Sequence, residues 1–306
     1  MSDMKNLKIN FVDFWDSFHK KDNYFYHLLS QEFNVIIDAK DPDLVIGSRF
    51  GSNIFDYKNH RSVKVYYTGE NDDARDPSYD FYITQHRTNE ANHFRLPLWA
   101  FFTSWFDECP LVHSRDPSFL IPWKSLDKNK IDLEAVYDAK KSFCSYIYAD
   151  ITKERRYWLD FFNSIRSVDS AGSSLNNTGG RLPGRGDQVY KIAFMSDYFF
   201  SLSIENSGID GYATEKILHP MSACVIPAYW GDTNVQEDIN VDSIIDLRRS
   251  ESEILEEIRE LLASKKSYLQ KLEKSWFVRD HSTMFMKECL EFFKRSLSQS
   301  QRKIVS

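Results

Sequence analysis

The sequence predicts an α/β protein with two Rossmann-like, doubly wound domains that face each other across a cleft. Short runs rich in β-branched and aromatic residues alternate with segments of helical periodicity, which is the pattern of parallel βαβ units. The length of 306 residues suits two domains of about 150 residues each better than one. Prolines and charges crowd residues 107–141, and a new strand follows, so the domain boundary is expected near residue 140.

The expected organisation is an N-terminal domain of residues 1–140, a C-terminal domain of residues 141–283 and a last segment of residues 284–306. This last segment is expected to pack back on the first domain. Each candidate strand is a short apolar run bounded by turn residues or charges. The expected strands are Leu7–Val12, Leu44–Gly47, Val63–Thr68, Asp80–Thr84, Phe143–Ala149, Phe199–Glu205, Cys224–Tyr229 and Ser243–Leu247.

The clearest helix is predicted over Ser252–Lys274, where isoleucines and leucines recur on one face. Ser250 and Glu253 have the spacing of a capping box ahead of it. A final helix is expected over about Met284–Leu297. Residues 170–186 are rich in glycine and polar side chains, so they are predicted to form a loop.

Charge and hydropathy exclude several classes of protein. The net charge of -6 disfavours nucleic acid as the main partner, because nucleic-acid-binding proteins carry an excess of Lys and Arg. We expect no transmembrane segment, since no stretch approaches the roughly 20 apolar residues of a membrane span. The first residues are polar and acidic where a signal peptide has an apolar run. A cytoplasmic location is therefore expected, with peripheral membrane contact left open.

No metal site is expected. The four cysteines, which are Cys109, Cys144, Cys224 and Cys289, lie far apart without CxxC spacing. The eight histidines show no ligand spacing, and no pair of aspartates has the DxD arrangement after a convincing strand. Buried, inert thiols are the expectation for such cysteines.

The segment of residues 199–231 holds the strongest candidate for a binding site. A buried strand ends at Glu205 and Asn206, a glycine-containing loop follows, and a helix is expected to begin near Ala213. Ligands of parallel sheets bind beyond the carboxyl ends of strands, where a helix N-terminus attracts anions. Lys216 would add a positive charge beside a diphosphate, and Glu215 could accept hydrogen bonds from vicinal hydroxyls. The alternative is an ordinary exposed helix start.

This segment resembles the donor-binding signature of the α-1,3/1,4-fucosyltransferases, glycosyltransferase family 10 of the bacterial type. The signature has the form F-x-x-x-x-E-N, then T-E-K after a short loop, then a strand ending in P-x-x-x-G. The resemblance implies the GT-B fold with GDP-fucose as the donor. It implies that the donor-binding residues include Asn206, Tyr212, Glu215 and Lys216.

Residues 63–85 and Arg95–Phe102 resemble the acceptor-side motifs of the same family, a strand ending in Y-T-G-E-N and an R-x-P-L-aromatic run. The family proposes a glutamate in this region as general base, which implies that role for Glu70. Many relatives have a second acid two residues later, and Asp72 occupies that position here. Asp72 therefore remains the alternative base.

Two further segments resemble the donor side of the family. An arginine before the aromatic-rich helix of residues 149–165 implies a phosphate contact by Arg155, with Arg156 as the alternative. The loop LNNTGGRLPG resembles a family element that would bring Asn177 and Arg181 to the donor. A plain surface loop is the equal alternative for those two residues.

The resemblance implies inverting transfer of fucose in α-1,3 linkage from GDP-fucose to a hydroxyl of an N-acetylglucosamine- or glucose-containing glycan. The acceptor is expected on the first domain and the nucleotide sugar on the second. No cofactor is required in this hypothesis, and a divalent cation is at most stimulatory. The alternatives are a GT-B transferase with another nucleotide sugar and a non-catalytic glycan- or nucleotide-binding protein. The linkage (α-1,3 or α-1,4), the acceptor, the oligomeric state and a location at the inner face of the membrane stay open.

Overall fold

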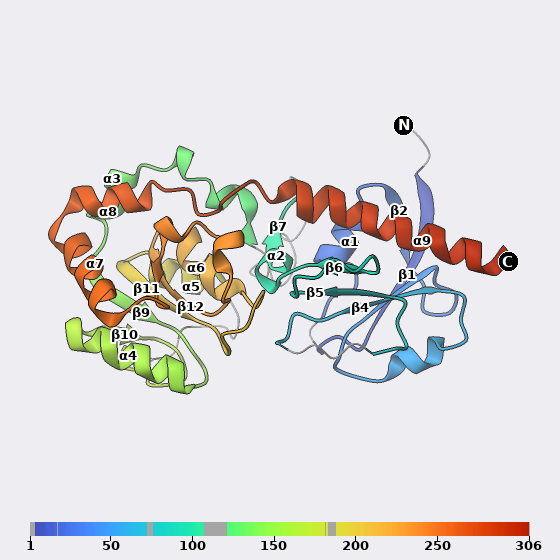
Figure 1. Ribbon diagram of the computed structural model, residues 1–306, viewed down its shortest axis with the longest axis horizontal. Helices are drawn as coiled ribbons and strands as arrows, with labels where there is room; N and C mark the ends of the chain where they lie inside the picture. The colour runs from blue at the N-terminus through green and yellow to red at the C-terminus, as the bar shows by residue number, and fades with distance from the viewer. Residues whose placement is uncertain are drawn as a thin grey trace. The chain divides into compact units, whose positions relative to one another are not determined.

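The computed structural model of the protein divides into two compact α/β units (Figure 1). Unit 1 comprises Met1–Ser114 and Asp280–Ser306, and unit 2 comprises Arg115–Arg279. The prediction had placed the boundary near residue 140. The predicted class of two Rossmann-like α/β domains is confirmed, because each unit has its own parallel sheet. The structure describes residues 4–16, 18–71, 76–106, 121–180, 182 and 188–305.

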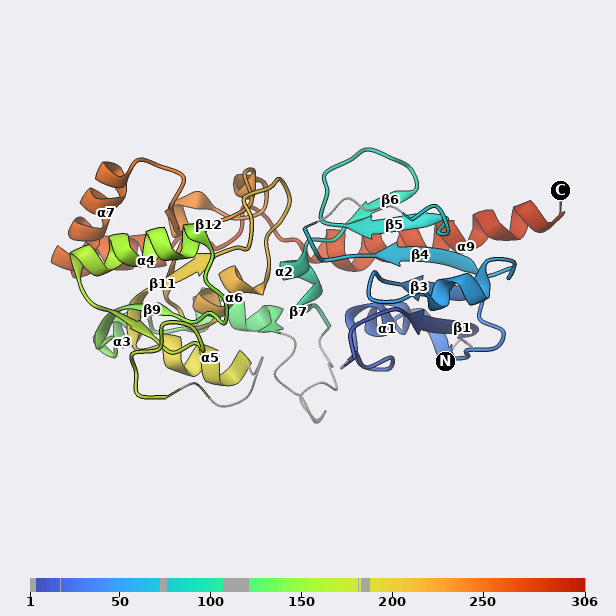
Figure 2. The ribbon, with the colours of Figure 1, turned by 90° about the horizontal axis from the view of Figure 1, so that it is seen from below.

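Unit 1 is built on a six-stranded parallel sheet with the order β2-β1-β3-β4-β5-β6. The chain runs from β1 to β2 on one side and then returns to form β3 on the other side of β1. Figure 2 shows β1, β3, β4, β5 and β6 side by side. The strands of this unit are β1 (Lys5–Val12), β2 (Phe33–Ile37), β3 (Leu44–Gly47), β4 (Val63–Tyr67), β5 (Phe81–Thr84), β6 (His93–Arg95) and the short β7 (Thr103–Ser104).

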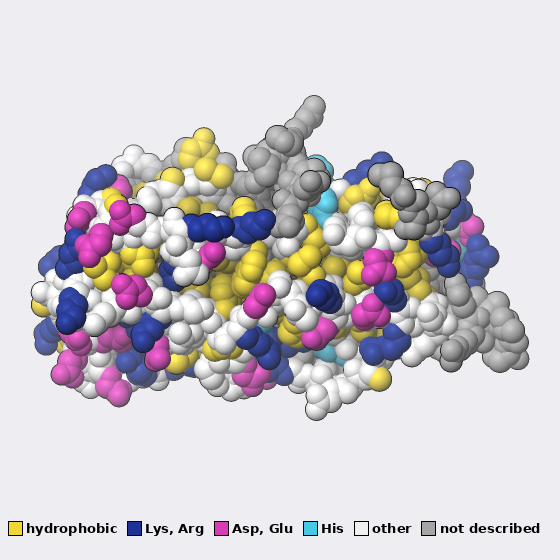
Figure 3. Space-filling model, turned by 90° about the horizontal axis from the view of Figure 1, so that it is seen from above, with side chains coloured by type: hydrophobic (Ala, Val, Ile, Leu, Met, Phe, Trp, Pro, Cys, Tyr) yellow, Lys and Arg dark blue, Asp and Glu magenta, His cyan; other side chains and the backbone are white. Residues whose placement is uncertain are grey.

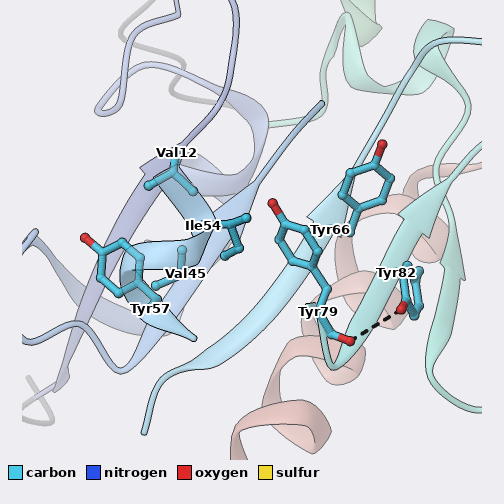
Figure 4. Packing of buried hydrophobic residues seen from close by; sticks show 7 residues of the cluster. All are labelled: Val12, Val45, Ile54, Tyr57, Tyr66, Tyr79 and Tyr82. Atoms are coloured by element: carbon cyan, nitrogen blue, oxygen red, sulfur yellow. Dashed lines mark hydrogen bonds between the residues drawn. The ribbon is translucent and has the colours of Figure 1, made fainter. Parts of the chain in front are cut away.

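Aromatic and aliphatic side chains fill both sides of this sheet. One cluster consists of Val12, Val45, Ile54, Tyr57, Tyr66, Tyr79 and Tyr82 (Figure 4). The hydroxyl of Tyr82 donates to the Tyr79 carbonyl at 3.4 Å, and Asn10 Nδ2 donates to the Tyr57 hydroxyl at 2.8 Å. The hydroxyls of Tyr57 and Tyr82 are thereby satisfied while the rings pack, whereas the buried Tyr79 hydroxyl has no hydrogen-bond partner among the described residues.

The C-terminal helix completes unit 1. It begins with a π-helical turn, Thr283–Glu288, and continues as α9 (Cys289–Val305), which is longer than the helix predicted to end near residue 297. Phe292 lies 5.8 Å from the Phe81 ring and Phe293 lies 5.9 Å from the Phe25 ring. The other helices of this unit are α1 (Tyr24–Leu29), the 3₁₀ turn η1 (Asn53–Tyr57) and α2 (Leu98–Phe101).

Unit 2 contains a five-stranded parallel sheet with the order β10-β9-β11-β12-β13. Helices α4 and α5 lie on opposite sides of it (Figure 2). The strands of this sheet are β9 (Ser142–Tyr146), β10 (Val168–Ser170), β11 (Tyr198–Ile204), β12 (Ile226–Trp230) and β13 (Ile245–Asp246), and unit 2 also contains the short strand β8 (Ile121–Pro122) outside it. Its α-helices are α3 (Leu133–Asp138), α4 (Lys153–Ile165), α5 (Gln188–Met195), α6 (Glu215–Ser222), α7 (Glu251–Ala263) and α8 (Lys265–Leu272). Its 3₁₀ turns are η3 (Trp123–Leu126), η4 (Lys128–Lys130), η5 (Val235–Glu237) and η6 (Val241–Ser243).

The predicted helix over Ser252–Lys274 is wrong in one respect, because the structure divides it into α7 and α8. Ser264 adopts an extended conformation between them and its hydroxyl accepts the Ser267 N–H at 3.1 Å, which caps α8. The apolar periodicity continues through the break, so periodicity alone does not reveal it. The capping box of Ser250 and Glu253 is confirmed.

Charged side chains of both signs are intermingled at the surface. Figure 3 shows this clearly over the end of the molecule formed by unit 2. None of the helices in the described part of the chain has the length and apolar character needed to cross a membrane.

Candidate active site

A pocket of about 240 Å³ lies in unit 2, beyond the carboxyl ends of β9 and β11. It is the place where ligands of open parallel sheets bind. Four of the residues predicted to bind the donor line it together: Arg155, Asn206, Glu215 and Lys216. The rest of the lining consists of Ile147, Tyr148, Ala149, Asp150, Lys191, Met195, Leu202 and His219.

The junction of β11 and α6 is fixed by the carboxylate of Glu205, which is fully buried. Its Oε1 accepts the Thr214 backbone N–H at 2.7 Å, and both of its oxygens lie within 2.9 Å of the Thr214 hydroxyl. Thr214 is also the N-cap of α6. Gly231 is needed beside them, because a Cβ there would lie 2.5 Å from Glu205 Cγ. Glu205 thus holds the N-terminus of α6 against the end of the sheet.

Lys216 carries the positive charge of this junction. Its ammonium lies 3.1 Å from Glu205 Oε2, 2.9 Å from the Thr214 hydroxyl and 3.9 Å from Glu215 Oε1, and its side chain is 19% exposed. Burial by itself would lower the pKa of Lys216, but the facing carboxylates of Glu205 and Glu215 raise it. Lys216 therefore remains a cation at the pocket wall.

The two acids beside Lys216 differ in their protonation equilibria. Burial raises the pKa of the Glu205 carboxyl, and Lys216 acts in the opposite direction. Burial would also raise the pKa of Glu215, but Lys216, His219 and Lys191 lower it to about 2. Glu215 is thus an ionised acceptor whose side chain is 20% exposed, as needed to receive hydrogen bonds from ligand hydroxyls.

Arg155 reaches the pocket from the first turn of α4 and is 3% exposed. Its Nε and Nη2 donate to the Ile204 carbonyl at 3.3 Å, and Nη2 also donates to Asn206 Oδ1. The guanidinium lies 4.3 Å from the centre of the Tyr148 ring. These contacts hold the guanidinium plane in one orientation at the end of β11.

Arg156, the alternative phosphate-binding arginine, lies elsewhere. Its side chain is 56% exposed and its Nε donates to Asp160 at 2.7 Å on the outer face of α4. It does not line the pocket as the described residues define it. The geometry therefore favours Arg155 for any ligand of this pocket.

His219 and Lys191 are pocket residues that the sequence reasoning missed. His219 is buried, and its Nε2 is hydrogen-bonded to Gln188 Oε1. Burial and the nearby Lys191 lower the His219 pKa to about 3, so the ring is neutral at physiological pH. Its position four residues after Glu215, on the same face of α6, is the signal that could have identified it.

The remaining predicted donor residues lie apart from the pocket lining, as far as the described residues define it. Tyr212 is buried in the loop before α6. Asn177 completes the edge of β10: its Oδ1 accepts the Ser170 N–H at 2.7 Å and its Nδ2 donates to the Val168 carbonyl at 2.9 Å. Arg181 lies outside the described residues.

Glu70 lies in unit 1, three residues after the end of β4. The residue is exposed, and its backbone N–H donates to the Thr68 hydroxyl at 3.1 Å. Gly69 permits the turn, because a Cβ there would lie 2.4 Å from Leu98 Cδ1 and 3.1 Å from the Tyr67 hydroxyl. Burial, and then the charge of Glu70, raise the pKa of Tyr67. Asp72, the alternative base, lies outside the described residues.

No group of three or more His, Cys, Asp or Glu side chains that could hold a metal ion occurs within the described ranges. Cys144, Cys224 and Cys289 are buried free thiols. Cys109 lies outside these ranges.

Two Rossmann-like units, one with a cation-lined pocket beyond its strand ends, define the class as a GT-B glycosyltransferase. Residues 9–102 match the family model of the alpha-(1,3)-fucosyltransferase FucT N-terminal domain. Residues 138–298 match that of the glycosyltransferase family 10 (fucosyltransferase) C-terminal region. The chain belongs to glycosyltransferase family 10.

Curated relatives carry related names. The chain is 26% identical over 327 residues to alpha-(1,3)-fucosyltransferase FucT of Helicobacter pylori, which covers 95% of this chain and 66% of that protein. It is 32% identical over 130 residues to the putative fucosyltransferase R654 of Acanthamoeba polyphaga mimivirus, covering 40% of this chain and 22% of that protein. The chain thus spans only part of the length of these relatives.

Solved structures share the fold over nearly the whole chain. A crystal structure of an alpha1,3-fucosyltransferase matches with a TM-score of 0.76 and 25% identity, covering 97% of this chain and 91% of that one. A structure described as alpha1,3-fucosyltransferase with GDP-fucose matches with a TM-score of 0.73 and 24% identity, covering 97% and 92%. The prediction of the family from its signature residues is confirmed.

Proposed function

We propose that this protein is an inverting α-1,3-fucosyltransferase that moves fucose from GDP-fucose to a hydroxyl of an N-acetylglucosamine- or glucose-containing glycan. The observation that carries the proposal is the single pocket in which Arg155, Asn206, Glu215 and Lys216 meet beyond the ends of β9 and β11. Membership of family 10 and the names of the relatives support the same activity. The proposal places the protein in the cytoplasm, with its acceptor either free or at the inner face of the membrane.

The donor diphosphate would bind between Arg155 and Lys216. The Arg155 guanidinium, whose Nε and Nη2 are engaged by Ile204 and Asn206, would present a fixed positive charge to the phosphate oxygens through its Nη1 side. The ammonium of Lys216 lies at the start of α6, where the helix dipole also favours negative charge. Glu215, ionised beside them, would accept hydrogen bonds from vicinal hydroxyls of the nucleotide. Fixed charges of this kind stabilise the leaving diphosphate as its charge grows.

The acceptor would react on the side of unit 1. Its hydroxyl oxygen forms a bond to the anomeric carbon of fucose while the bond from that carbon to the diphosphate oxygen breaks. The hydroxyl proton passes to the carboxylate of Glu70, and GDP leaves with the electron pair of the broken bond. The configuration at the anomeric carbon inverts in this single displacement. Positioned bases of this kind contribute about 10²–10⁴-fold to the rate.

The test is incubation of the protein with GDP-fucose and a library of β-galactosides, including lactose and N-acetyllactosamine, with products identified by mass spectrometry and NMR. We expect one fucose to be added in α-1,3 linkage, with or without EDTA. Transfer from a UDP- or ADP-linked sugar instead would overturn the choice of donor. Binding of GDP without transfer to any acceptor would support a non-catalytic protein.

A further inference from the structure

An aromatic cluster in unit 1 has no role in the donor site. It consists of Phe14, Trp15 and Phe18, which follow β1, and Phe50, which follows β3; we call these four residues the aromatic platform. The rings of Phe14 and Phe18 are stacked with their centres 3.9 Å apart. Trp15 packs edge-on against Phe18 at 5.2 Å and against Phe50 at 6.3 Å. The four rings therefore form one continuous surface.

The platform is anchored to the core but is not itself core. Phe14 is stacked 6.0 Å from the buried Tyr67 ring, and Trp15 lies 6.2 Å from the buried Phe101 ring. In contrast, Phe50 is 51% exposed, and Phe14, Trp15 and Phe18 are half-buried. Exposure of so much adjoining aromatic surface is costly in water and is typical of binding sites.

Asp13 builds the platform by tying its two loops together. Its Oδ1 accepts the backbone and side-chain N–H groups of Asn53 at 2.8 and 2.7 Å, and its Oδ2 accepts the Ile54 N–H at 3.0 Å. Its carbonyl accepts the Phe50 N–H at 2.9 Å. Asp13 does this with a φ of 60°, a left-handed conformation that is unfavourable for a non-glycine residue. Strain of this kind concentrates at functional sites.

The platform occupies the position in the fold where a ligand is expected. The strand order reverses between β1 and β3, and the loops that leave these two strands carry the platform. This is the topological switch point, where ligands of doubly wound sheets bind. Because all six strands are parallel, the turn that carries Glu70 after β4 leaves the same edge of the sheet. Phe14 also stacks on Tyr67, the last residue of β4, which precedes Glu70 by three residues.

We propose that the aromatic platform binds the acceptor saccharide, with the apolar C–H face of a pyranose ring packed on Trp15 and Phe50 and its hydroxyl rim directed to the side of Glu70. A pyranose has one face of C–H groups and a rim of hydroxyls, so an aromatic surface beside a carboxylate suits it. This inference rests on the proposed fucosyl transfer. In this proposal the platform sets the affinity for the acceptor, and the donor binds in the pocket of unit 2.

The experiment compares Trp15→Ala and Phe50→Ala with Trp15→Phe and Phe55→Ala, using lactose and N-acetyllactosamine as acceptors. Phe55 is an equally exposed aromatic (58%) in the same unit and outside the platform, so it is the matched control. Both alanine variants of the platform should raise the acceptor KM about tenfold or more while the Kd of GDP by calorimetry stays within about twofold. Trp15→Phe should restore most of the affinity, and Phe55→Ala should leave the acceptor KM unchanged.

Saturation-transfer NMR of the same saccharides with the GDP-bound protein measures the platform without any turnover. Signals from one face of the sugar in the unaltered protein, and their loss in Trp15→Ala, support the proposal even if no transfer occurs. An absence of transfer would then count against the proposed function alone. Unchanged acceptor KM and unchanged NMR signals in both alanine variants, or an equal effect of Phe55→Ala, would contradict the proposal that the platform binds the acceptor.

Discussion

The pocket of unit 2 and the aromatic platform of unit 1 lie at equivalent places in two similar folds, yet they are built in opposite ways. The pocket is a set of buried charges, with Arg155 and Lys216 held by carbonyls and carboxylates within 3.3 Å. The platform is a half-exposed surface of aromatic rings, and the hydrogen bonds that fix its two loops are made by Asp13. Five of the twelve pocket residues come from β11, the residues that follow it and α6, which are adjacent in the chain. The platform needs two loops that are separated by two strands.

The difference follows from the ligands that we propose for each site. A nucleoside diphosphate has fixed charges, so its binding to preorganised cations offsets the free-energy cost of burying those cations. A neutral saccharide such as lactose offers many hydroxyls and an apolar ring face, so broad aromatic contact binds it at low cost in side-chain entropy. If this account is right, substitutions in unit 2 should change GDP affinity, and those in unit 1 should change acceptor use or turnover.

The largest effect is expected from Glu70→Ala. Loss of the proposed base should reduce turnover at least about 100-fold and leave GDP affinity nearly unchanged. Steady-state rates with saturating acceptor, together with calorimetry, measure both quantities. Asp56→Asn, another exposed carboxylate of unit 1, is the matched control and should retain full activity. Normal turnover in Glu70→Ala would remove Glu70 from the mechanism, and loss of activity in Asp72→Asn would move the role there.

The next effect concerns the cations of unit 2. Lys216→Ala should weaken GDP binding about 10- to 100-fold, because one charge-assisted contact to phosphate is lost. It should also lower the unfolding temperature, since Glu205 would remain buried without its cation. Arg156→Ala is the control in the same unit and should bind GDP normally. Equal GDP affinity in Lys216→Ala and Arg156→Ala would contradict the phosphate role.

A smaller effect should appear as acid sensitivity of unit 2. The pKa of buried His219 lies at about 3, below the usual value near 6.5, so protonation favours the unfolded chain. The contribution of His219 to stability is complete above pH 6.5 and is lost as the pH falls toward 3. By pH 5 the loss is about 2 kcal/mol. Glu215, with its pKa lowered to about 2, contributes no change until the pH falls below about 4.5.

Thermal unfolding at pH 7.5 and pH 5 tests this expected acid sensitivity of unit 2. Between pH 7.5 and pH 5 the unfolding temperature of unit 2 should decrease more in the unaltered protein than in His219→Gln, whose side chain cannot become charged. GDP, which we propose binds the pocket of unit 2, should raise the unfolding temperature of that unit and so identify its transition. An equal decrease in both proteins would show that His219 does not titrate as expected.

The sequence predicted the pocket of unit 2 better than the aromatic platform of unit 1, and the reasons are physical. Strand end, loop and helix N-terminus are contiguous in residues 199–231, so a local pattern was enough to find Glu215 and Lys216. The choice between Arg155 and Arg156 was left open, although helical periodicity places Arg155, and not Arg156, on the buried face of α4 with Trp158 and Phe162. Strand β2 was not predicted, since it is an edge strand with alternating partly exposed residues.

The platform shows the same limit more strongly. Trp15 and Phe50 are 35 positions apart, and their contact depends on a sheet order in which β3 returns to the side of β1. The aromatic residues after β1 have helical spacing, which is more often a sign of core packing than of a binding surface. Asp13, which joins the two loops, has a left-handed backbone conformation. This conformation arises in the folded chain and cannot be predicted from the residue type alone.

The smallest predicted effect separates two interpretations of Asn177. The resemblance assigns it to a loop that contacts the donor, whereas in the structure its amide satisfies the N–H of Ser170 and the carbonyl of Val168 at the edge of β10. If the structural role is its only one, Asn177→Ala should lower stability by about 1 kcal/mol and leave GDP affinity unchanged. Asn177→Asp keeps the contact to Ser170 and should lose about half as much. A clear loss of GDP affinity in both variants, without a change in unfolding temperature, would instead place the loop on the donor and extend the charged pocket of unit 2 beyond its present wall.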